Sequence, residues 1–195
     1  MAQTRTFIAV ELSDAVRRRA CDLVERLRAS EARVGWVSPE NMHITLKFLG
    51  EQSDDDIATI CQAVIEAAQQ VPPFEFNCHG AGAFPNCSRP RTVWIGVREG
   101  VDALNDLHQH IEDKLRRRGY KREKRAFHPH VTVGRVRRGG PAVETLGELI
   151  AAAEDFEAGK VSVDEVVVFG SHLGRGGPRY QSLARAPLEG RAEQG

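Results

Sequence analysis

The apolar residues of the chain recur in two alternating patterns, one with the spacing of a helix and one with the spacing of a strand. After the N-cap residue Ser13, helical spacing predicts a helix over residues 13–30, with an apolar face made of Val16, Ala20, Leu23, Val24 and Leu27. The same spacing predicts a second helix from Ser53, a third over 101–119 and a fourth over 143–153.

Short runs rich in β-branched and aromatic residues lie between these helices and predict strands. They cover residues 7–11, 42–49, 74–78, 93–97, 130–136, 161–169 and 180–184. The resulting order is β-α-β-α-β-β-α-β-α-β-β, in which the second half resembles a repeat of the first. We therefore expect two related α+β lobes that form one domain over residues 1–195, with a polar, frayed tail over 189–195.

Two of the predicted strands carry the same His-x-Thr pattern. They read His43-Ile-Thr45-Leu and His130-Val-Thr132-Val, 87 residues apart. Side chains two residues apart leave the same face of a strand, so each histidine shares a face with its threonine while the apolar neighbours face a core. Seven histidines and seven threonines in 195 residues predict about 0.25 chance matches, so two matches are rarely accidental.

A pair of histidines on facing strands suits the cleavage of a phosphodiester. One imidazole can take the proton of the attacking oxygen while the other protonates the leaving oxygen, because the unperturbed pKa of histidine lies near neutrality. In-line displacement requires these two groups on opposite sides of phosphorus. The Thr45 and Thr132 hydroxyls can hold the non-bridging oxygens, where negative charge builds up. This pattern predicts His43 and His130 as an acid and base pair.

Two other interpretations of the histidines stay open at this point. In the first, each is a half-buried strand residue whose hydrogen bonds are satisfied and which has no chemical role. In the second they bind a metal, since His128 and His130 lie two residues apart, but neither motif has acidic or cysteine ligands nearby. We expect no metal and no other cofactor, with His128 positioning the strand and Pro129 fixing the backbone at its entry.

The charged residues are distributed unevenly along the chain. The chain has 27 basic and 27 acidic residues, and a formal net charge of zero argues against general binding of nucleic acid. Between Lys114 and Arg138, however, there are eleven Lys or Arg residues and a single acid, Glu123. This stretch contains His130, so it is either a solvated helix end and loop or a rim that attracts phosphate.

The remaining composition is typical of a globular cytoplasmic protein. Apolar residues make up 41% of the chain, and the longest apolar run, Val166 to Phe169, is far shorter than the roughly 20 residues of a membrane span. The N-terminus leads directly into a predicted strand and lacks a secretory apolar region. The four cysteines have neither metal-binding nor disulfide spacing. We expect reduced cysteines, a cytoplasmic location and no membrane partner.

The segments around the two motifs resemble a known family. Residues 38–51 read Ser-Pro-Glu-Asn-Met-His-Ile-Thr-Leu-Lys-Phe-Leu-Gly-Glu, and residues 127–135 read Phe-His-Pro-His-Val-Thr-Val-Gly-Arg. These resemble the 2H phosphoesterase superfamily, and within it the RNA 2′,3′-cyclic phosphodiesterases, also called 2′-5′ RNA ligases. The Phe7-Ile-Ala-Val start, the Trp94 strand and residues 176–183 also suit that family, so the resemblance covers nearly the whole chain.

The resemblance implies a bilobal, pseudo-twofold α+β fold in which two antiparallel-rich sheets face a central cleft and helices pack outside. It implies metal-independent hydrolysis of an RNA-terminal 2′,3′-cyclic phosphate to a 2′-phosphomonoester, with a weak, reversible, ATP-independent joining of tRNA-like halves through a 2′-5′ linkage. His43 would be the acid that protonates the leaving 3′ oxygen, and His130 the base that activates water. Thr45 and Thr132 would hold the phosphate.

Two further residues match family positions but conflict with simple strand alternation. Phe48 matches an aromatic residue that stacks on the terminal base, yet its alternation with Ile44 and Leu46 predicts a place in the core. Arg135 matches a basic position that contacts phosphate, yet alternation puts it opposite His130 unless a bulge intervenes. Residues 174–179 either reach the substrate or form a plain hairpin, which we expect.

The substrate stays open among several phosphodiesters. Besides RNA ends, a 2′-5′ oligoadenylate or an ADP-ribose cyclic phosphate would suit the same machinery. A module that binds nucleotides without turnover is disfavoured by the presence of both histidines and both threonines. Net ligation is disfavoured by the absence of an adenylating lysine motif or a P-loop. We expect a monomer whose partners are RNA ends or nucleotides with a 2′,3′-cyclic phosphate, tRNA halves included.

Overall fold

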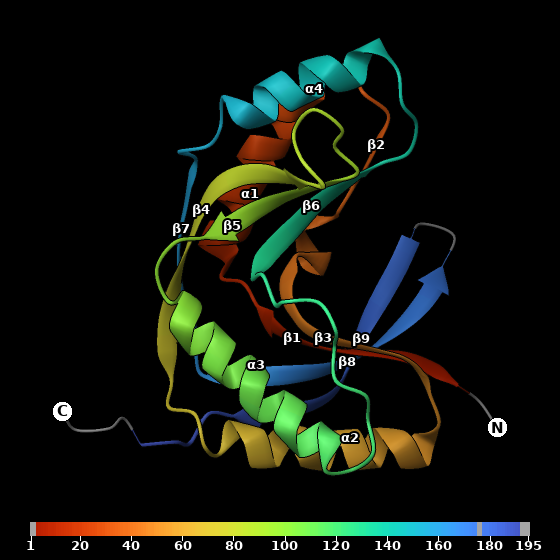
Figure 1. Ribbon diagram of the computed structural model, residues 1–195, viewed down its shortest axis with the longest axis vertical. Helices are drawn as coiled ribbons and strands as arrows, with labels where there is room; N and C mark the ends of the chain where they lie inside the picture. The colour runs from red at the N-terminus through yellow and green to blue at the C-terminus, as the bar shows by residue number, and fades with distance from the viewer. Residues whose placement is uncertain (1–2, 175–176, 192–195) are drawn as a thin grey trace.

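Strands and helices alternate along residues 3–174 and 177–191, the parts of the chain that the computed structural model describes (Figure 1). The strands are β1 (Thr4–Glu11), β2 (Val34–Trp36), β3 (His43–Gln52), β4 (Phe74–Phe84), β5 (Thr92–Val97), β6 (His130–Val136), β7 (Glu157–Val163), β8 (Glu165–Gly174) and β9 (Gly177–Pro187). The helices are α1 (Asp14–Arg28), α2 (Asp54–Ala68), α3 (Val101–Arg116) and α4 (Pro141–Ala151), with a 3₁₀ turn at Pro39–Asn41. The α+β class is confirmed.

Two of the helices begin at the N-caps that the sequence predicts. The Ser13 hydroxyl accepts the Val16 N–H at 3.3 Å at the start of α1. At the start of α2, the Ser53 hydroxyl accepts the Asp56 N–H at 3.2 Å, and the Asp56 carboxylate accepts the Ser53 N–H at 3.3 Å. These bonds satisfy backbone donors that have no partner within a helix.

The strands form one antiparallel sheet rather than the two separate sheets that we expected. Its order is β7-β4-β5-β6-β3-β1-β8-β9, and β2 pairs with β6. Strands β3 and β6 are joined through the single residue pair Ile44 and Val131, within the described part of the chain. The expected sheets are therefore two halves of one curled sheet, and the narrow join between them consists of the two strands that carry the His-x-Thr motifs.

Two of the four helices, α1 and α3, lie in the half opposite to that of the strand that they follow. In Figure 1, α1 and α4 lie beside the half made of β2 and β4–β7, whereas α2 and α3 lie beside β1, β3, β8 and β9. Helix α1 follows β1 but packs on β7, and α3 follows β5 but packs on α2. Each half thus contains a helix that leaves a strand of the other half.

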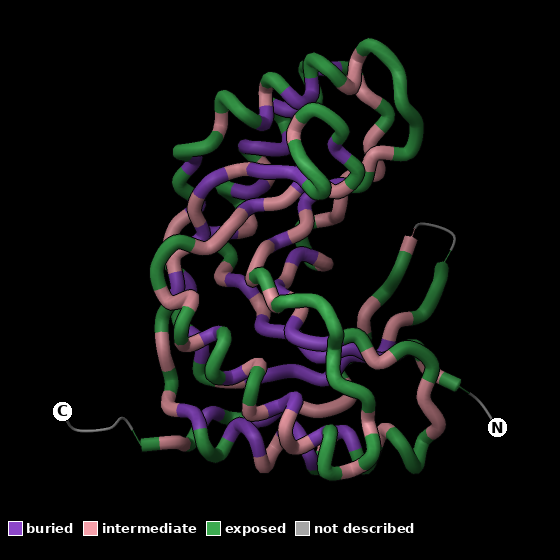
Figure 2. Tube along the Cα trace, viewed as in Figure 1, coloured by how far each residue is buried: buried purple, intermediate pink, exposed green. Residues whose placement is uncertain are grey.

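Buried residues follow the strands and the inner faces of the helices (Figure 2). Most of them belong to one continuous apolar core, which includes Ile44 and Val131. A second, smaller cluster of Phe7, Ala9, Val167 and Phe169, with Tyr180 packed on it, is separate from this core. Phe7 stacks on the ring of His43, so this cluster lies beneath the first motif.

Three details differ from the sequence prediction. The predicted strand over 161–169 is two strands that turn at Asp164 and lie in opposite halves of the sheet, because β7 pairs with β4 and β8 pairs with β1. The three-residue strand β2 was too short to be predicted. In the predicted frayed tail, Glu189 and Gly190 donate backbone hydrogen bonds to the carbonyls of Ala68 and Val71 at 3.2 and 3.1 Å, while residues 192–195 lie outside the described residues.

Among the helices of the described residues, none has both the length and the apolar character needed to cross a bilayer.

Candidate active site

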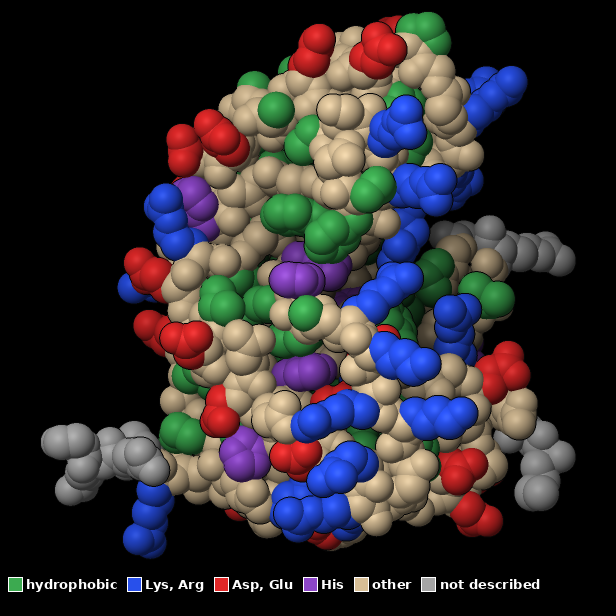
Figure 3. Space-filling model, in the orientation of Figure 1, with side chains coloured by type: hydrophobic (Ala, Val, Ile, Leu, Met, Phe, Trp, Pro, Cys, Tyr) green, Lys and Arg blue, Asp and Glu red, His purple; other side chains and the backbone are tan. Residues whose placement is uncertain are grey.

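The four side chains of the two motifs lie on one face of the sheet, at the join between its halves. Ile44 and Val131 are paired in antiparallel register and fully buried, so the residues on either side of them face the opposite way, away from the core. Continuing that register aligns His43 with Thr132 and His130 with Thr45. Figure 3 shows histidine side chains in the hollow between the two halves, with Lys and Arg side chains along one rim.

The backbone before His43 fixes which of its ring nitrogens is free to react. His43 Nδ1 lies 2.8 Å from the Asn41 carbonyl oxygen, and because a carbonyl can only accept, Nδ1 carries the hydrogen. In the neutral ring Nε2 is then an acceptor, and the Thr45 hydroxyl lies 2.9 Å from it. The first motif thus presents Nε2 and a hydroxyl side by side.

The second motif repeats this arrangement. His130 Nδ1 donates to the carbonyl of His128 at 2.6 Å, again two residues before the motif histidine. His128 therefore acts through its backbone at this point, and Nε2 of the neutral His130 ring is also left as an acceptor. The internal repeat inferred from the sequence extends to the hydrogen bonds that orient the two rings.

Aromatic rings pack against both histidines and contribute to their burial. His43 stacks on Phe7, with ring centroids 4.9 Å apart, and meets Tyr180 edge-on at 5.5 Å. His130 meets Phe84 edge-on at 5.0 Å. Burial lowers the pKa of His43 to about 4 and also lowers the pKa of His130. Both rings are therefore neutral at pH 7 in the absence of a bound anion.

A β-bulge places Phe48 on the same side as the first motif. In the ladder of β1 with β3, Leu46 is skipped between the paired residues Thr45 and Lys47. The bulge reverses the alternation, so that Lys47 is buried and Phe48 is 60% exposed, with its ring 5.9 Å from that of Phe7. The core position predicted from alternation is wrong for this reason.

A second β-bulge places Arg135 on the same side of the sheet as the second motif. In the ladder of β5 with β6, Val133 is skipped after Thr132, so Arg135 shares the face of Thr132 and His130. The Arg135 guanidinium donates to the Thr92 hydroxyl at 3.4 Å. Burial is the main cause of the lowered pKa of His130, and the charge of Arg135 lowers it further. The opposite face predicted from alternation is therefore also wrong.

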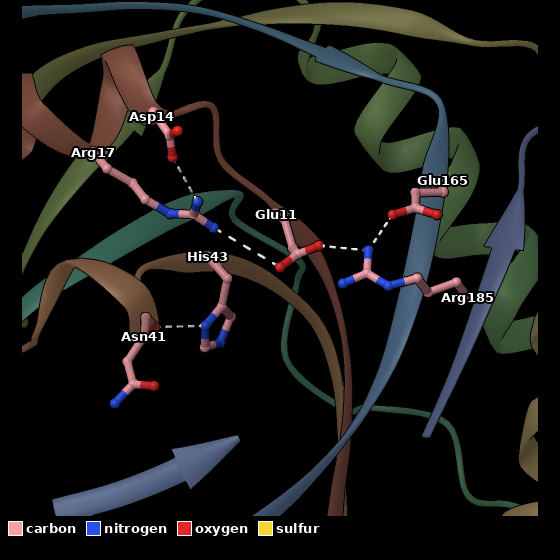
Figure 4. A network of polar contacts seen from close by, with 7 residues as sticks. All are labelled: Glu11, Asp14, Arg17, Asn41, His43, Glu165 and Arg185. Atoms are coloured by element: carbon pink, nitrogen blue, oxygen red, sulfur yellow. Dashed lines mark hydrogen bonds and ion pairs between the residues drawn. The ribbon is translucent and has the colours of Figure 1, made fainter. Parts of the chain in front are cut away.

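A network of charged side chains lies beside His43, as Figure 4 shows. The Glu11 carboxylate lies 3.9 Å from the Arg17 guanidinium and accepts a hydrogen bond from Arg185 at 2.8 Å. A hollow of about 490 Å³ lies beside these groups, and its lining includes His43 and Tyr180. None of the charged residues was predicted from the sequence, because they are brought together from separate elements with no shared motif.

Tyr180 is another site residue that the sequence argument left without a role. Besides its contact with His43, its ring packs edge-on against Phe7 at 4.8 Å. Burial raises the pKa of the Tyr180 hydroxyl, so that it keeps its proton.

Strands β8 and β9 pair up to Gly174 and Gly177, as expected for a hairpin, whereas residues 175 and 176 lie outside the described residues.

Comparison with known proteins identifies the family of this fold and site. The sequence profile of the 2′-5′ RNA ligase superfamily matches residues 13–175, and the chain belongs to that superfamily, whose members are 2H phosphoesterases. It is 36% identical over 186 residues to a Thermotoga maritima protein named RNA 2′,3′-cyclic phosphodiesterase, covering 95% of this chain and 96% of that protein. A Methanothermobacter thermautotrophicus protein of the same name is 35% identical over 182 residues, covering 93% and 97%.

Solved structures agree with this assignment. The apo crystal structure of Escherichia coli LigT superposes with a TM-score of 0.74 at 25% identity, covering 96% of this chain and 99% of that one. A structure of the same E. coli protein with 3′-AMP gives a TM-score of 0.71 at 27% identity, with the same coverage. The bilobal fold inferred from the sequence is thus confirmed.

Proposed function

We propose that this protein hydrolyses RNA-terminal 2′,3′-cyclic phosphate to a 2′-phosphomonoester, using two histidines and no metal ion. The observation that carries the proposal is the matched pair of imidazoles, His43 and His130. Both lie on the cleft face of adjoining strands, and in both the Nδ1 hydrogen is bound to a backbone carbonyl. Each ring therefore offers Nε2 for proton transfer. The name of the relatives, RNA 2′,3′-cyclic phosphodiesterase, supports hydrolysis of a 2′,3′-cyclic phosphate.

In the proposed reaction, His130 Nε2 takes a proton from water as the water oxygen attacks phosphorus. The bond between phosphorus and the 3′ oxygen breaks, and protonated His43 gives its proton to that oxygen. The products are a 2′-phosphomonoester and a free 3′-hydroxyl. In ligation a 5′-hydroxyl group replaces water: His130 takes its proton, the bond between phosphorus and the 3′ oxygen breaks with protonation by His43, and a 2′-5′ linkage forms. The two histidines exchange roles when that linkage is cleaved again, because the 3′-hydroxyl then attacks phosphorus and the 5′ oxygen leaves.

The acid of the pair needs a proton that the free protein holds weakly. Burial lowers the pKa of His43 to about 4 and also lowers the pKa of His130. A phosphate anion between the rings raises both pKa values, because it favours the charged imidazolium. The resemblance assigns the acid to His43, and the pH dependence of kcat/KM in His43→Ala and His130→Ala tests that direction.

The remaining groups of the cleft hold the substrate in this proposal. The Thr45 and Thr132 hydroxyls bind the non-bridging oxygens, and Arg135 balances the charge that develops on them. The exposed ring of Phe48 stacks on the terminal base. We further propose that the protein works as a cytoplasmic monomer, since one chain supplies both histidines, and that tRNA halves are among its substrates.

The test is an incubation of the purified protein with a 2′,3′-cyclic-phosphate oligonucleotide in the presence of EDTA. The expected product is the 2′-phosphate alone. Exclusive formation of the 3′-phosphate would overturn the assigned polarity, and activity abolished by EDTA and restored by a divalent cation would overturn the metal-free reaction. The variant with both His43→Ala and His130→Ala serves as the control for contaminating nucleases.

A further inference from the structure

A second hollow, of about 460 Å³, is lined in part by Phe48, and its other lining residues have no role in the reaction described above. One side of it is formed by residues 120–125, which connect α3 to β6 and are called the strap here. The strap carries four exposed cations: Lys121, Arg122, Lys124 and Arg125. Arg122 pairs with Asp113 at 2.9 Å, whereas the other three make no ion pair with any described residue.

A buried ion pair holds the strap in place from below. Lys47 and Glu112 are 6% and 1% exposed, and they form a direct ion pair. The Lys47 ammonium also donates to the Lys121 carbonyl at 3.1 Å, and the Glu112 carboxylate accepts the Glu123 N–H at 3.3 Å. The ion pair thus holds the strap backbone at Lys121 and Glu123, while the cationic side chains of the strap are exposed.

A row of packed aromatic rings connects this hollow to the candidate active site. Phe7 lies between His43 and Phe48, with centroids 4.9 Å from the first ring and 5.9 Å from the second. Phe48 is a large apolar side chain that is exposed beside fixed cations. An exposed aromatic ring next to unpaired cations suits single-stranded nucleic acid, in which bases stack and phosphates attract positive charge.

We infer that the hollow beside Phe48 and the strap together form a groove for RNA. This groove binds the nucleotides that precede the RNA terminus, with their phosphates against Lys121, Lys124 and Arg125. This assignment rests on the proposed function, because it takes the cyclic phosphate at His43 and His130 as the end of the strand. RNA runs from that end past Phe48 and along the strap. The protein therefore favours oligonucleotides over a nucleoside cyclic phosphate, and the added affinity is electrostatic and sensitive to salt.

The test compares kcat/KM for uridine 2′,3′-cyclic phosphate with that for oligouridylates of two, four and eight nucleotides with the same terminus. For the wild-type protein, kcat/KM should rise at least tenfold with length. In the triple variant K121Q/K124Q/R125Q this rise should disappear, while kcat/KM for the mononucleotide stays within twofold. Three phosphate contacts predict about a 20-fold greater loss between 50 and 200 mM salt for the wild type than for the variant.

A second triple variant, R18Q/R98Q/K160Q, removes the same charge from three exposed cations that line neither hollow. It should keep the wild-type dependence on length. A wild-type rate that does not depend on length, or an equal loss with both triple variants, would overturn the groove. Equal competition by a polyglutamate peptide and by an oligouridylate with a 3′-hydroxyl would show a site for acidic chains in general, and would also overturn it. No turnover of the mononucleotide or of any oligomer would instead overturn the proposed function.

Discussion

The low pKa of His43 makes the stability of the protein depend on pH. Burial beside Phe7 and Tyr180 lowers this pKa to about 4, against 6.5 for an ordinary histidine. As the pH falls, the unfolded chain therefore takes up the proton before the folded one does. The stabilising contribution of neutral His43 is fully present above about pH 6.5 and is lost as the pH falls toward 4.

The difference between the pKa of His43 in the folded chain and that of an ordinary histidine in the unfolded chain sets the size of the effect. It is equivalent to about 3 kcal/mol in the free energy of unfolding, of which about 2 kcal/mol is lost between pH 7 and pH 5. For a chain of this length, that loss lowers the Tm by about 4–8 °C. Other groups titrate over the same range, so the contribution of His43 has to be isolated by a variant.

The assay is urea unfolding at pH 7 and pH 5, for the wild type and for His43→Phe. Phenylalanine keeps the stacking on Phe7 but cannot take up a proton, so the variant should lose about 2 kcal/mol less than the wild type between the two pH values. The same replacement at His172, which is exposed on the β8–β9 hairpin, should leave the wild-type difference unchanged. An equal loss in the wild type and in His43→Phe would refute the reasoning.

Two further substitutions test the groups around the site. Lys47→Met leaves the Glu112 carboxylate buried without its cation and should lower the free energy of unfolding by about 3–5 kcal/mol, whereas Glu66→Gln, which breaks a partly exposed ion pair, should cost about 1 kcal/mol or less. Denaturant unfolding measures both, and equal effects would contradict the burial argument. Phe48→Ala should raise the KM for a cyclic-phosphate oligonucleotide about 5- to 150-fold with little change in kcat, because base stacking contributes about 1–3 kcal/mol, and Phe48→Tyr should restore it. An unchanged KM in the alanine variant would remove Phe48 from base binding.

The sequence predicts the helices and the motif strands well, because these depend on local spacing and capping. The Ser13 and Ser53 caps and the His-x-Thr strands can all be read from residues within one turn or one strand. The sequence pattern does not reveal the turn at Asp164, because residues 161–169 read as one apolar run. In the structure this run crosses from one half of the sheet to the other. Local patterns carry no information about such a crossing.

The bulges at Leu46 and Val133 explain why alternation failed for Phe48 and Arg135 but not for the motif residues. Each bulge lies after the threonine of its motif, so the histidine and threonine keep the normal alternation and the fifth residue after the histidine changes face. An extra residue in a ladder depends on the neighbouring strand, which the sequence of one strand does not reveal. Both residues lie on the face that the roles implied by the resemblance require.

The most direct test of the histidine pair is the pH dependence of kcat/KM for a 2′,3′-cyclic-phosphate oligonucleotide, measured with the wild type, His43→Ala and His130→Ala. The wild-type rate should peak between the two pKa values of the coupled pair. Each variant should be slower by about 10²- to 10⁴-fold. His43→Ala should lose the decline at high pH, which reports the acid, and His130→Ala the decline at low pH, which reports the base. If both variants kept full activity and the wild-type profile, acid and base catalysis by this pair would be contradicted.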